Sequence, residues 1–501
     1  MPLSYDDNKP TTVHDEFALG SAQTGRGEEI AQYEPGGAEE KAFIRKLDYR
    51  LIPIIWFMYV MSYLDRANIG NAKTGGMERD LNLTSNEYSI ALLVFFAMSS
   101  AKALPSNMIL VRVKPAIYLP ALMCTWGGIS MCLAACNSYQ TLSVVRFFLG
   151  IVEAGFAPGI LFLLSSWYRK NELATRFALY YTASAFSGAL GGLLAGVITG
   201  NLDGKGGVAG WRYLFIIEGA ATIIASLFAY WLLPNFPATT SWLTEREKWL
   251  CAARLQADGV GAAQGDSETL GHGKALKSVL ADWRTYFMTF LFMMVTGAQT
   301  IQYFIPTLTK KMGYQGVMAQ YMTIPIYMVA VVGIIIIPMS SDRTKERAWH
   351  ITISMLGGAA CFAVLIATQH PKVQYAFLCF GVAAIYANPP LVLVWTSNII
   401  AYPAEKRAIT QAFVNALGNS ASIYGSFLWP AKTGPKYTMG FAVTLAMLAA
   451  CAAGAQAMNY LNKKYPYSYE MPARRQDVEM PEEMGTGAET PLEKSDMSHA
   501  T

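Results

Sequence analysis

Charged residues are scarce in this sequence. Asp, Glu, Lys and Arg make up 15% of its 501 residues, whereas a typical soluble protein has about 25%. The net charge is only +4 and no run of five or more basic residues occurs, so we expect no nucleic acid partner. Hydrophobic residues supply 53% of the chain, and the mean hydropathy is +0.27. Much of the chain must therefore contact lipid.

Metal ligands and phosphate-binding loops are equally rare. The five His residues lie in tails, in loops or at the edges of apolar runs, which excludes a membrane haem or di-iron centre and argues against an oxidoreductase. Six of the seven Cys residues lie inside apolar runs, where Cys usually acts as a small hydrophobic residue. Neither Gly204-Lys205 nor Gly273-Lys274 is followed by Ser or Thr, so the P-loop of an ATP-driven pump is not present. We expect no enzyme activity and no cofactor.

The two ends of the sequence are polar. Residues 1–40 contain no apolar core of the kind found in a cleavable signal sequence, so we expect this end to stay in the cytosol. Both tails, up to about Glu40 and beyond about Asn462, are rich in Asp, Glu, Gly, Pro and Ser, a composition typical of disorder. We therefore predict disordered cytosolic tails over 1–45 and 462–501.

Apolar runs, each close to the roughly 20 residues that a membrane-spanning helix needs, fill the sequence between the tails. There are twelve, over residues 51–70, 88–110, 116–136, 142–164, 177–200, 212–233, 286–306, 317–338, 349–367, 374–396, 408–429 and 438–460. A polar stretch, Pro234 to Asp282, separates the sixth run from the seventh. The sequence predicts an all-α membrane protein with 12 transmembrane helices in two six-helix halves, 46–233 and 284–461, joined by a cytosolic middle loop over 234–283.

The basic residues of the short loops predict the orientation in the membrane, because Lys and Arg are enriched in cytosolic loops. With the N-terminus inside, roughly twice as many loop Lys and Arg residues lie on the cytosolic side as on the opposite side. Both termini are then cytosolic. We expect a multi-pass monomer in the plasma membrane.

Charged side chains inside the apolar runs are the most informative exception. Asp65 and Arg66 lie in the first run, and Arg146 and Glu153 lie in the fourth. A charge in the hydrocarbon costs about 2.5–3.5 kcal/mol on insertion scales, so such residues usually face a bundle interior or a polar pathway. At 1.5 Å per residue, Asp65 lies about 21 Å from the cytosolic end of its run, and Arg146 lies roughly 6–10 Å from the outer end of its own. Glu153, two turns further on the same helix face as Arg146, falls near the midplane.

Several motifs are similar to those of a known family. They are Asp65-Arg66-Ala67-Asn68, Arg146-Phe147-Phe148 with Glu153-Ala154-Gly155, Pro105-Ser106-Asn107, Trp167-Tyr168, Gly210-Trp211-Arg212, Ile217-Glu218-Gly219, Ser341-Asp342-Arg343, and Trp395 with Asn398. Over about residues 45–460 the chain resembles the major facilitator superfamily, and within it the anion:cation symporter family, in particular its fungal branch of allantoate, nicotinate and vitamin permeases. Lys102-Ala103 departs from that pattern, because the family usually has an aromatic residue followed by Glu before Pro-Ser-Asn.

The resemblance implies that Asp65 and Glu153 couple transport to protons and that Arg66 and Arg146 bind an anionic substrate. A carboxylate in a low-dielectric cavity can take up a proton, and a nearby Arg can hold either that carboxylate or an anion. The alternative is that Asp65 and Arg146 form a buried ion pair that only stabilises the first half.

Other polar residues have both a functional and a structural interpretation. Lys102 is predicted to contact an anionic substrate, although its side chain could instead reach the membrane interface. Glu218 could belong to the site, or it could bind Arg212 or a loop backbone. In the second half, neutral polar and aromatic residues could bind substrate between the halves near the midplane, or could hold helices together: Gln299, Tyr303, Asn388, Trp395, Asn398, Gln411, Asn415 and Asn419. Of these we predict Tyr303, Trp395 and Asn398 to be substrate-binding residues.

Two further motifs concern the helix ends and the helix contacts. Asp342, Arg343 and Arg347 resemble the loop motif that the superfamily repeats in its second half, and this resemblance predicts a gating role. The alternative is that they only belong to the general excess of positive charge in cytosolic loops. Gly188, Gly192 and Gly196 recur at a spacing of four and predict a close approach of another helix.

These observations favour a proton-coupled symporter of a small organic anion, such as a carboxylate, a ureide acid or a vitamin. Its partners would be that substrate, protons and the lipid bilayer. An exporter of an acidic secondary metabolite with the same fold is the alternative, for which Lys102-Ala103 is a mild indication. A nutrient sensor that does not transport is a third possibility, but a sensor has no need of proton carriers such as Asp65 and Glu153.

Overall fold

The computed structural model describes residues 36–110, 113–257, 272–400, 404–430, 433–434 and 436–467. The chain divides into two units, Met1–Pro466 and Tyr467–Thr501, and the fold described below is that of the first. Its described residues form helices and no strand. The predicted disordered tails lie outside the described residues over 1–35 and 468–501.

The inner boundaries of both predicted tails are wrong by several residues. Helix α2 spans Ala38–Ala72, so residues 38–45 are helical rather than disordered. Its first turn is fixed by Glu40, a buried carboxylate that pairs with Arg169 at 2.9 Å and with Arg254 at 2.8 Å. The acidic composition that predicted disorder thus provides ion-pair partners instead. At the other end, α20 continues to Lys464.

Each of the twelve predicted runs falls on helix. The first six correspond to α2, α4 (Ser85–Leu110), α5 (Pro115–Cys132) with η3 (Leu133–Ala135), α6 (Tyr139–Glu153) with α7 (Phe156–Ser165), α8 (Lys170–Leu202) and α9 (Gly210–Leu232). The last six correspond to α12 (Trp283–Gln299) with η7 (Thr300–Tyr303) and α13 (Ile305–Lys311), α14 (Val317–Tyr321) with α15 (Thr323–Thr344), α16 (Ala348–Ala367), α17 (Pro371–Ile399), α18 (Ala404–Asn419) with α19 (Ala421–Gly425), and α20 (Thr438–Lys464).

Short helices lie between the long ones. They are η2 (Lys73–Met77), α3 (Glu78–Asp80), η4 (Lys205–Gly207), η5 (Pro237–Thr239), α10 (Glu245–Ala257) and α11 (His272–Leu280). The last three belong to the segment predicted as a middle loop, which therefore contains helical structure of its own.

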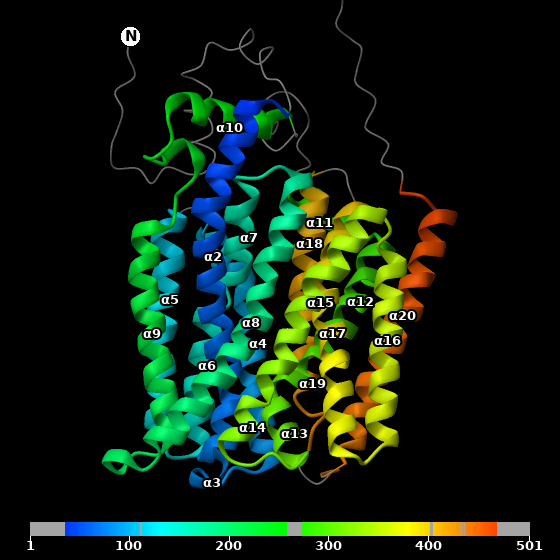
Figure 1. The fold of residues 1–501 in the computed structure, drawn as a ribbon. Coiled ribbons are helices and arrows are strands. Elements are labelled where there is room, and N and C mark those ends of the chain that lie inside the picture. Colours follow the sequence, from blue (N-terminus) through cyan, green and yellow to red (C-terminus); the bar gives the residue numbers. More distant parts are fainter. Residues whose placement is uncertain are drawn as a thin grey trace, which may run out of the picture. The chain divides into compact units, whose positions relative to one another are not determined.

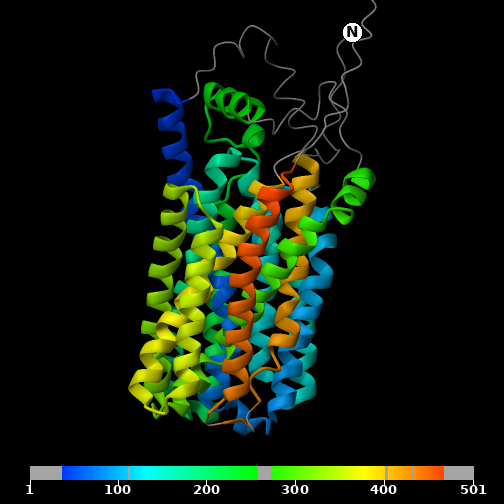
Figure 2. The ribbon, with the colours of Figure 1, turned by 90° about the vertical axis from the view of Figure 1, so that its right-hand side faces the viewer.

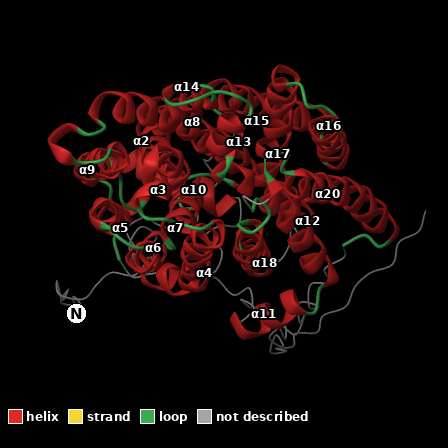
Figure 3. Ribbon diagram, turned by 90° about the horizontal axis from the view of Figure 1, so that it is seen from below, coloured by secondary structure: helices red, strands yellow, loops and turns green. Residues whose placement is uncertain are grey.

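The long helices stand side by side in two groups, α2 to α9 and α12 to α20, as Figures 1 and 2 show from two sides and Figure 3 shows along the helix axes. Among the described residues, eight helices are long and apolar enough to cross a membrane, and nine if the bent pair Trp283–Tyr303 and Ile305–Lys311 counts as one span. Helices α2, α4 and α18 do not meet that length and hydropathy criterion, yet they lie among the spanning helices (Figure 1). The chain is thus an all-α membrane protein of two six-helix halves.

Two helices are interrupted in the interior of the bundle. Ser138 caps α6, because its Oγ accepts a hydrogen bond from the Thr141 backbone N–H at 3.3 Å, but that helix ends at Glu153, before Gly155. Helix α12 gives way to η7 and then to α13, which is bent from it by 55°. Irregular backbone at membrane depth is tolerated where it is buried in protein or lines a cavity. Both interruptions border the pocket described below.

The two halves touch at the end of the bundle that holds α3, α13 and α14, here called the α13 end (Figure 1). The Tyr88 hydroxyl donates to the Tyr303 carbonyl at 3.1 Å, and the Ser89 hydroxyl donates to the Ser426 carbonyl at 2.7 Å. The Gln320 amide donates to the Asn71 carbonyl at 3.1 Å. A Cβ atom on Gly70 would lie 2.8 Å from the Tyr303 carbonyl oxygen, so α2 and η7 are in backbone contact. These contacts close the α13 end.

The glycine stripe of α8 confirms the predicted close approach and adds to this closure. A Cβ atom on Gly188 would lie 2.5 Å from the Tyr327 ring, and Cβ atoms on Gly192 and Gly196 would collide with Thr323 and Tyr321. Helix α8 of the first half therefore packs directly on α14 and α15 of the second.

Ion pairs at the opposite end, here called the α10 end, attach α10 to the first half. Arg254 of α10 pairs with Glu40 of α2 at 2.8 Å and with Glu172 of α8 at 2.7 Å. Lys46 pairs with Glu247 at 2.7 Å. The two lysine hydrogen bonds and those of Thr244 hold the pKa of the Glu247 carboxyl below its usual value although partial desolvation acts in the opposite direction.

Candidate functional site

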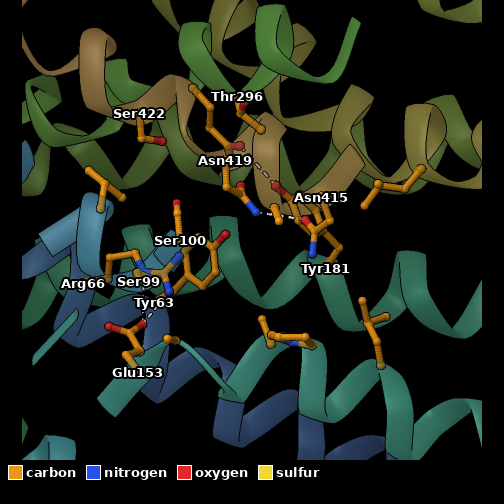
Figure 4. A pocket seen from close by; sticks show the side chains of 18 of the residues that line it. Tyr63, Arg66, Ser99, Ser100, Glu153, Tyr181, Thr296, Asn415, Asn419 and Ser422 are labelled. Atoms are coloured by element: carbon orange, nitrogen blue, oxygen red, sulfur yellow. Dashed lines mark hydrogen bonds and ion pairs between the residues drawn. The ribbon is translucent and has the colours of Figure 1, made fainter. Parts of the chain in front are cut away.

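A pocket lies between the two halves, on the α10 side of the contacts that close the α13 end. It contains about 1230 Å³ of space between atoms, the part open to solvent included. Figure 4 shows its two walls facing each other. The first half contributes Tyr59, Tyr63, Arg66, Ser99, Ser100, Glu153 and Tyr181, and the second contributes Thr296, Gln299, Tyr303, Asn415, Asn419 and Ser422, among others.

An ion pair forms the charged part of this pocket. Arg66 Nη2 lies 2.6 Å and Arg66 Nε 3.0 Å from Glu153 Oε1, and the Ser62 hydroxyl donates to the same oxygen at 2.9 Å. The Arg66 side chain is 19% exposed, whereas that of Glu153 is 1% exposed. The guanidinium also lies over the Tyr63 ring, 5.0 Å from its centroid. Glu153 therefore has a fixed partner, which the sequence did not reveal.

Asp65, next to Arg66 in the chain, faces away from the pocket toward α5 and α9. Its carboxylate accepts hydrogen bonds from Thr222 Oγ1 at 2.8 Å, Trp126 Nε1 at 3.2 Å and Ser130 Oγ at 3.4 Å. Consecutive residues on a helix are rotated by about 100°, which explains why Asp65 and Arg66 belong to different environments.

The predicted alternative of an Asp65–Arg146 ion pair is wrong. Arg146 is fully buried, and none of its three guanidinium nitrogens has a hydrogen-bond partner among the described residues. The guanidinium stands over the Phe95 ring at 5.6 Å and interacts with Asp65 and Glu153 only through longer-range electrostatics. Arg146 does not line the pocket, so its predicted direct contact with substrate has no support in this arrangement.

The predicted alternative that Glu218 binds Arg212 is also wrong. Its expected partner Arg212 donates to the Ala134 carbonyl and, at 2.8 Å, to Asn137 Oδ1. Glu218 itself is 1% exposed, and neither carboxylate oxygen has a hydrogen-bond donor among the described residues.

Neutral polar groups make up the second wall of the pocket. Tyr303, a predicted substrate-binding residue, does line it. The Tyr181 hydroxyl donates across the two halves to Gln299 Oε1 at 3.1 Å. On α18 the Asn419 amide donates to Asn415 Oδ1 at 2.9 Å. The carbonyl and amide groups of this wall can accept and donate hydrogen bonds.

Three predicted substrate-binding residues lie off the pocket. Lys102 is exposed on α4, consistent with the snorkelling alternative. Trp395 is buried within the packing of α17, and Asn398 is exposed near the end of that helix. Helix α17 does reach the pocket wall, but through Leu393. Among the other polar candidates, Asn388 donates to Ser354 at 2.9 Å and Gln411 to the Leu393 carbonyl at 3.0 Å, as helix-packing residues do.

The residues predicted to gate the protein form a local pair. Arg347 Nη2 lies 2.7 Å from Asp342 Oδ1, while Arg343 is exposed at the end of α15. Their gating role stays a prediction.

Tyrosines of the first half were missed at the sequence level although a signal for them existed. Tyr59, Tyr63 and Arg66 follow one another at helical spacings of four and three, and therefore share a face of α2. Tyr59 stacks on Tyr180 of α8 with a centroid distance of 3.9 Å. Starting from Arg66 and counting back by helical turns would have found this aromatic wall.

A pocket between two six-helix halves, closed at one end and lined by a buried ion pair, defines a membrane transporter of the alternating-access class. The chain belongs to the Major Facilitator Superfamily, whose family model matches residues 55–426. It is 35% identical over 459 residues to MFS transporter prlL of Fungal sp. (strain NRRL 50135), a match that covers 88% of this chain and 91% of the relative.

Other comparisons agree with this assignment. The chain is 34% identical over 461 residues to MFS-type transporter cnsO of Penicillium expansum, covering 87% of this chain and 88% of the relative. It is 31% identical over 401 residues to a putative tartrate transporter of Agrobacterium vitis, covering 79% and 85%. Among solved structures, a bacterial homolog of the human lysosomal transporter Spinster, in an inward-facing and unoccupied conformation, shares the fold with a TM-score of 0.64 at 16% identity, covering 83% of this chain and 98% of that one.

Proposed function

We propose that this transporter is a proton-coupled symporter of a small organic anion, such as a carboxylate, a ureide acid or a vitamin. The observation that carries the proposal is the Arg66–Glu153 pair in the pocket between the halves. A guanidinium offers the planar fork that binds a carboxylate, and in this structure a carboxylate of the protein itself occupies it.

This pair supports a simple coupling scheme. When Glu153 takes up a proton it loses the negative charge that holds Arg66, and the guanidinium is then free to bind the carboxylate of a substrate. When the proton leaves, Glu153 competes with the substrate for the same guanidinium and favours its release. Proton and anion therefore bind together and leave together.

The rest of the pocket supports recognition of a polar, partly planar anion. Tyrosine rings of the first half offer flat apolar faces, and the amides of the second half offer hydrogen bonds. The Agrobacterium vitis relative is named as a putative tartrate transporter, which supports the carboxylate class and makes tartrate a reasonable first probe.

The proposed orientation places the α10 end in the cytosol, because the basic loop residues predict both termini inside. The pocket would then be closed from the outside, with Asp342, Arg343 and Arg347 on the cytosolic side as gating residues. We propose the plasma membrane as location and a monomer as the working unit. Export is not favoured by any observation on the pocket, since Lys102, its one indication, lies off the pocket wall.

Uptake by the full chain in proteoliposomes of known orientation tests the proposal. Tartrate and a panel of other carboxylates are offered with and without an inward proton gradient, and we expect accumulation of at least one of them only with the gradient. Accumulation that ignores the gradient, or gradient-driven efflux instead of uptake, would contradict symport.

The variant Glu153→Gln sharpens this test, because Gln resembles protonated glutamate. We expect it to keep substrate counterflow and to lose gradient-driven accumulation. Glu245→Gln, on the exposed face of α10, is the matched control and should behave like the natural protein. Undiminished accumulation by Glu153→Gln would remove Glu153 from the coupling scheme.

A further inference from the structure

A second buried carboxylate stands behind the pocket, next to Asp65. Glu218 lies on α9 one helical turn before Thr222, so the two side chains share a face of that helix. Thr222 Oγ1 donates to Asp65 Oδ2 at 2.8 Å. The Cβ atoms of Glu218 and Thr222 are therefore about 5–6 Å apart, and the Glu218 and Asp65 carboxyl groups interact electrostatically.

Tight helix packing surrounds this pair. A Cβ atom on Gly127 of α5 would lie 3.0 Å from the Gly219 carbonyl oxygen and 3.2 Å from Thr222 Cγ2. Both acids are 1% exposed. Glu218 is thus buried where α5 and α9 pack closely, and its two oxygens have no hydrogen-bond donor among the described residues.

The charged and titratable neighbours of the two acids differ. Asp65 has three neutral donors, Thr222, Trp126 and Ser130. It also interacts with two charged groups of α6, the Arg146 guanidinium and the Glu153 carboxylate. Glu218 interacts with Asp65 of α2. The groups that α5 contributes here are the Trp126 indole and the Ser130 hydroxyl, which bond to Asp65 and do not titrate. Asp65 therefore has hydrogen-bond donors, which stabilise an ionised carboxylate, whereas Glu218 has none among the described residues.

The electrostatics decide which of the two acids carries a proton. An ionised carboxylate in an apolar interior is costly unless it is paired and hydrogen-bonded. Two carboxylates that share one site do not both ionise easily, because each disfavours the charge of the other. The pair therefore holds a proton more readily on Glu218, which has no donor among the described residues, than on Asp65, which has three.

We propose that Glu218 is a proton-binding site of this transporter, separate from the substrate pocket and linked to it through Asp65. The step is the reversible dissociation of the Glu218 carboxylic acid to a carboxylate and a proton, and it needs no other reactant. Asp65 is joined to the pocket by the peptide bond to Arg66, so the charge of the buried pair acts on the helix that carries the substrate-binding guanidinium. The coupling role rests on the proposed symport function; the proton site itself does not.

Infrared difference spectroscopy of the reconstituted full chain tests the proton site without any substrate. Titration from acidic to alkaline buffer should remove the carbonyl stretch of a protonated carboxylic acid in the natural protein. We expect the part of that signal that persists to the most alkaline buffers to be missing from Glu218→Gln and to be retained by the control Glu245→Gln. In Asp65→Asn, which removes the neighbouring negative charge, the signal should disappear at a lower pH than in the natural protein.

The outcome that overturns the proton site is a Glu218→Gln protein with the full carbonyl signal of the natural protein and the same pH dependence. Failure to fold is separated by a thermal melt, and Glu218→Asp, which keeps an acid at the position, should restore a carbonyl signal. Gln has the shape of protonated glutamate, so Glu218→Gln should melt close to the natural protein; a large loss of melting temperature would itself argue that Glu218 is ionised.

Transport measurements test the coupling role separately. With whichever carboxylate the natural protein accumulates, Glu218→Gln should keep counterflow and lose most gradient-driven accumulation. Full accumulation by Glu218→Gln, with as many protons moved per substrate as in the natural protein, overturns the coupling role. If the natural protein accumulates no carboxylate in response to a proton gradient while the Glu218 signal is present, the symport function fails and the proton site stands.

Discussion

The two halves of the bundle line one pocket with different chemistry. The first half supplies the ion pair Arg66–Glu153 and, directly behind it, the buried acids Asp65 and Glu218 and the buried Arg146. The second half supplies amides, hydroxyls and a tyrosine, among them Gln299, Tyr303 and Asn415. One wall therefore carries charge and the other carries neutral hydrogen-bonding groups.

This division has a physical advantage for a protein whose halves move against each other. A buried charge that loses its partner destabilises a protein by about 3–5 kcal/mol, so an ion pair that spanned the two halves would resist their separation. The charged groups of the pocket instead find their partners within the first half. The contacts between the walls are neutral, such as that of Tyr181 with Gln299, and are easily exchanged for water.

The largest effect is expected for Arg66→Gln. It removes the only cation that lines the pocket among the described residues and leaves the Glu153 carboxylate buried without its partner, so we expect transport to be lost and the free energy of unfolding to fall by about 3–5 kcal/mol. The double variant Arg66→Gln with Glu153→Gln should recover stability but not transport. Thermal melting and proteoliposome uptake measure the two effects; uptake by the double variant would show that the first wall does not bind the anion through charge.

A charge placed on the second wall tests the comparison from the other side. In Asn415→Asp the new carboxylate can still accept the Asn419 hydrogen bond, so shape is preserved and only a negative charge is added to the wall that faces the Arg66 wall (Figure 4). We expect KM for an anionic substrate to rise about tenfold or more, which corresponds to about 1.4 kcal/mol. Asn415→Ser is the uncharged control. Equal KM values for Asn415→Asp and the natural protein would mean that the second wall does not face the bound anion.

A smaller effect is expected when a neutral contact is removed. Gln299→Ala leaves the Tyr181 hydroxyl without its acceptor in the pocket, and an uncharged hydrogen bond contributes about 1 kcal/mol. We expect KM to change severalfold and the number of protons moved per substrate to stay the same. A loss of proton coupling in Gln299→Ala would show that the neutral wall takes part in coupling. It would contradict the assignment of coupling to the first half alone.

The smallest effect is expected for Lys102→Gln. Lys102 belongs to the first half but is exposed and lies off the pocket, so uptake, KM and melting temperature should match those of the natural protein. A large rise in KM for anionic substrates would show that Lys102 reaches the pocket in another state of the transport cycle.

The sequence predicted the helices of the fold better than the partners within the site. Runs of about 20 apolar residues are required by the thickness of the bilayer, so the order of the helices follows from the sequence alone. The spacing of Arg146 and Glu153 correctly placed them on one face of α6, but helix periodicity does not say which neighbouring helix that face meets. Glu153 therefore pairs with Arg66, and Asp65 bonds to Thr222 of α9, 157 residues away, rather than to Arg146.

Single polar residues in the second half were the least predictable. Trp395 and Asn398 occur in a motif of the resembled family, yet α17 turns Leu393 toward the pocket instead. For Asn415 and Asn419 helix packing was the favoured interpretation, and only the rotation of α18 in the bundle places them on the wall. That rotation depends on side-chain packing with α12 and α17, which a single sequence does not contain.

The seal at the α13 end depends on backbone carbonyl groups of Tyr303, Ser426 and Asn71. A carbonyl is present whatever side chain the residue bears, so mutation at these acceptor positions does not abolish the acceptor. The residue at position 303, which also lines the pocket, can therefore change while this acceptor of the seal is kept. The donors are side-chain groups, so most substitutions remove them. We therefore expect Tyr88, Ser89 and Gln320 to diverge more slowly than the pocket they close.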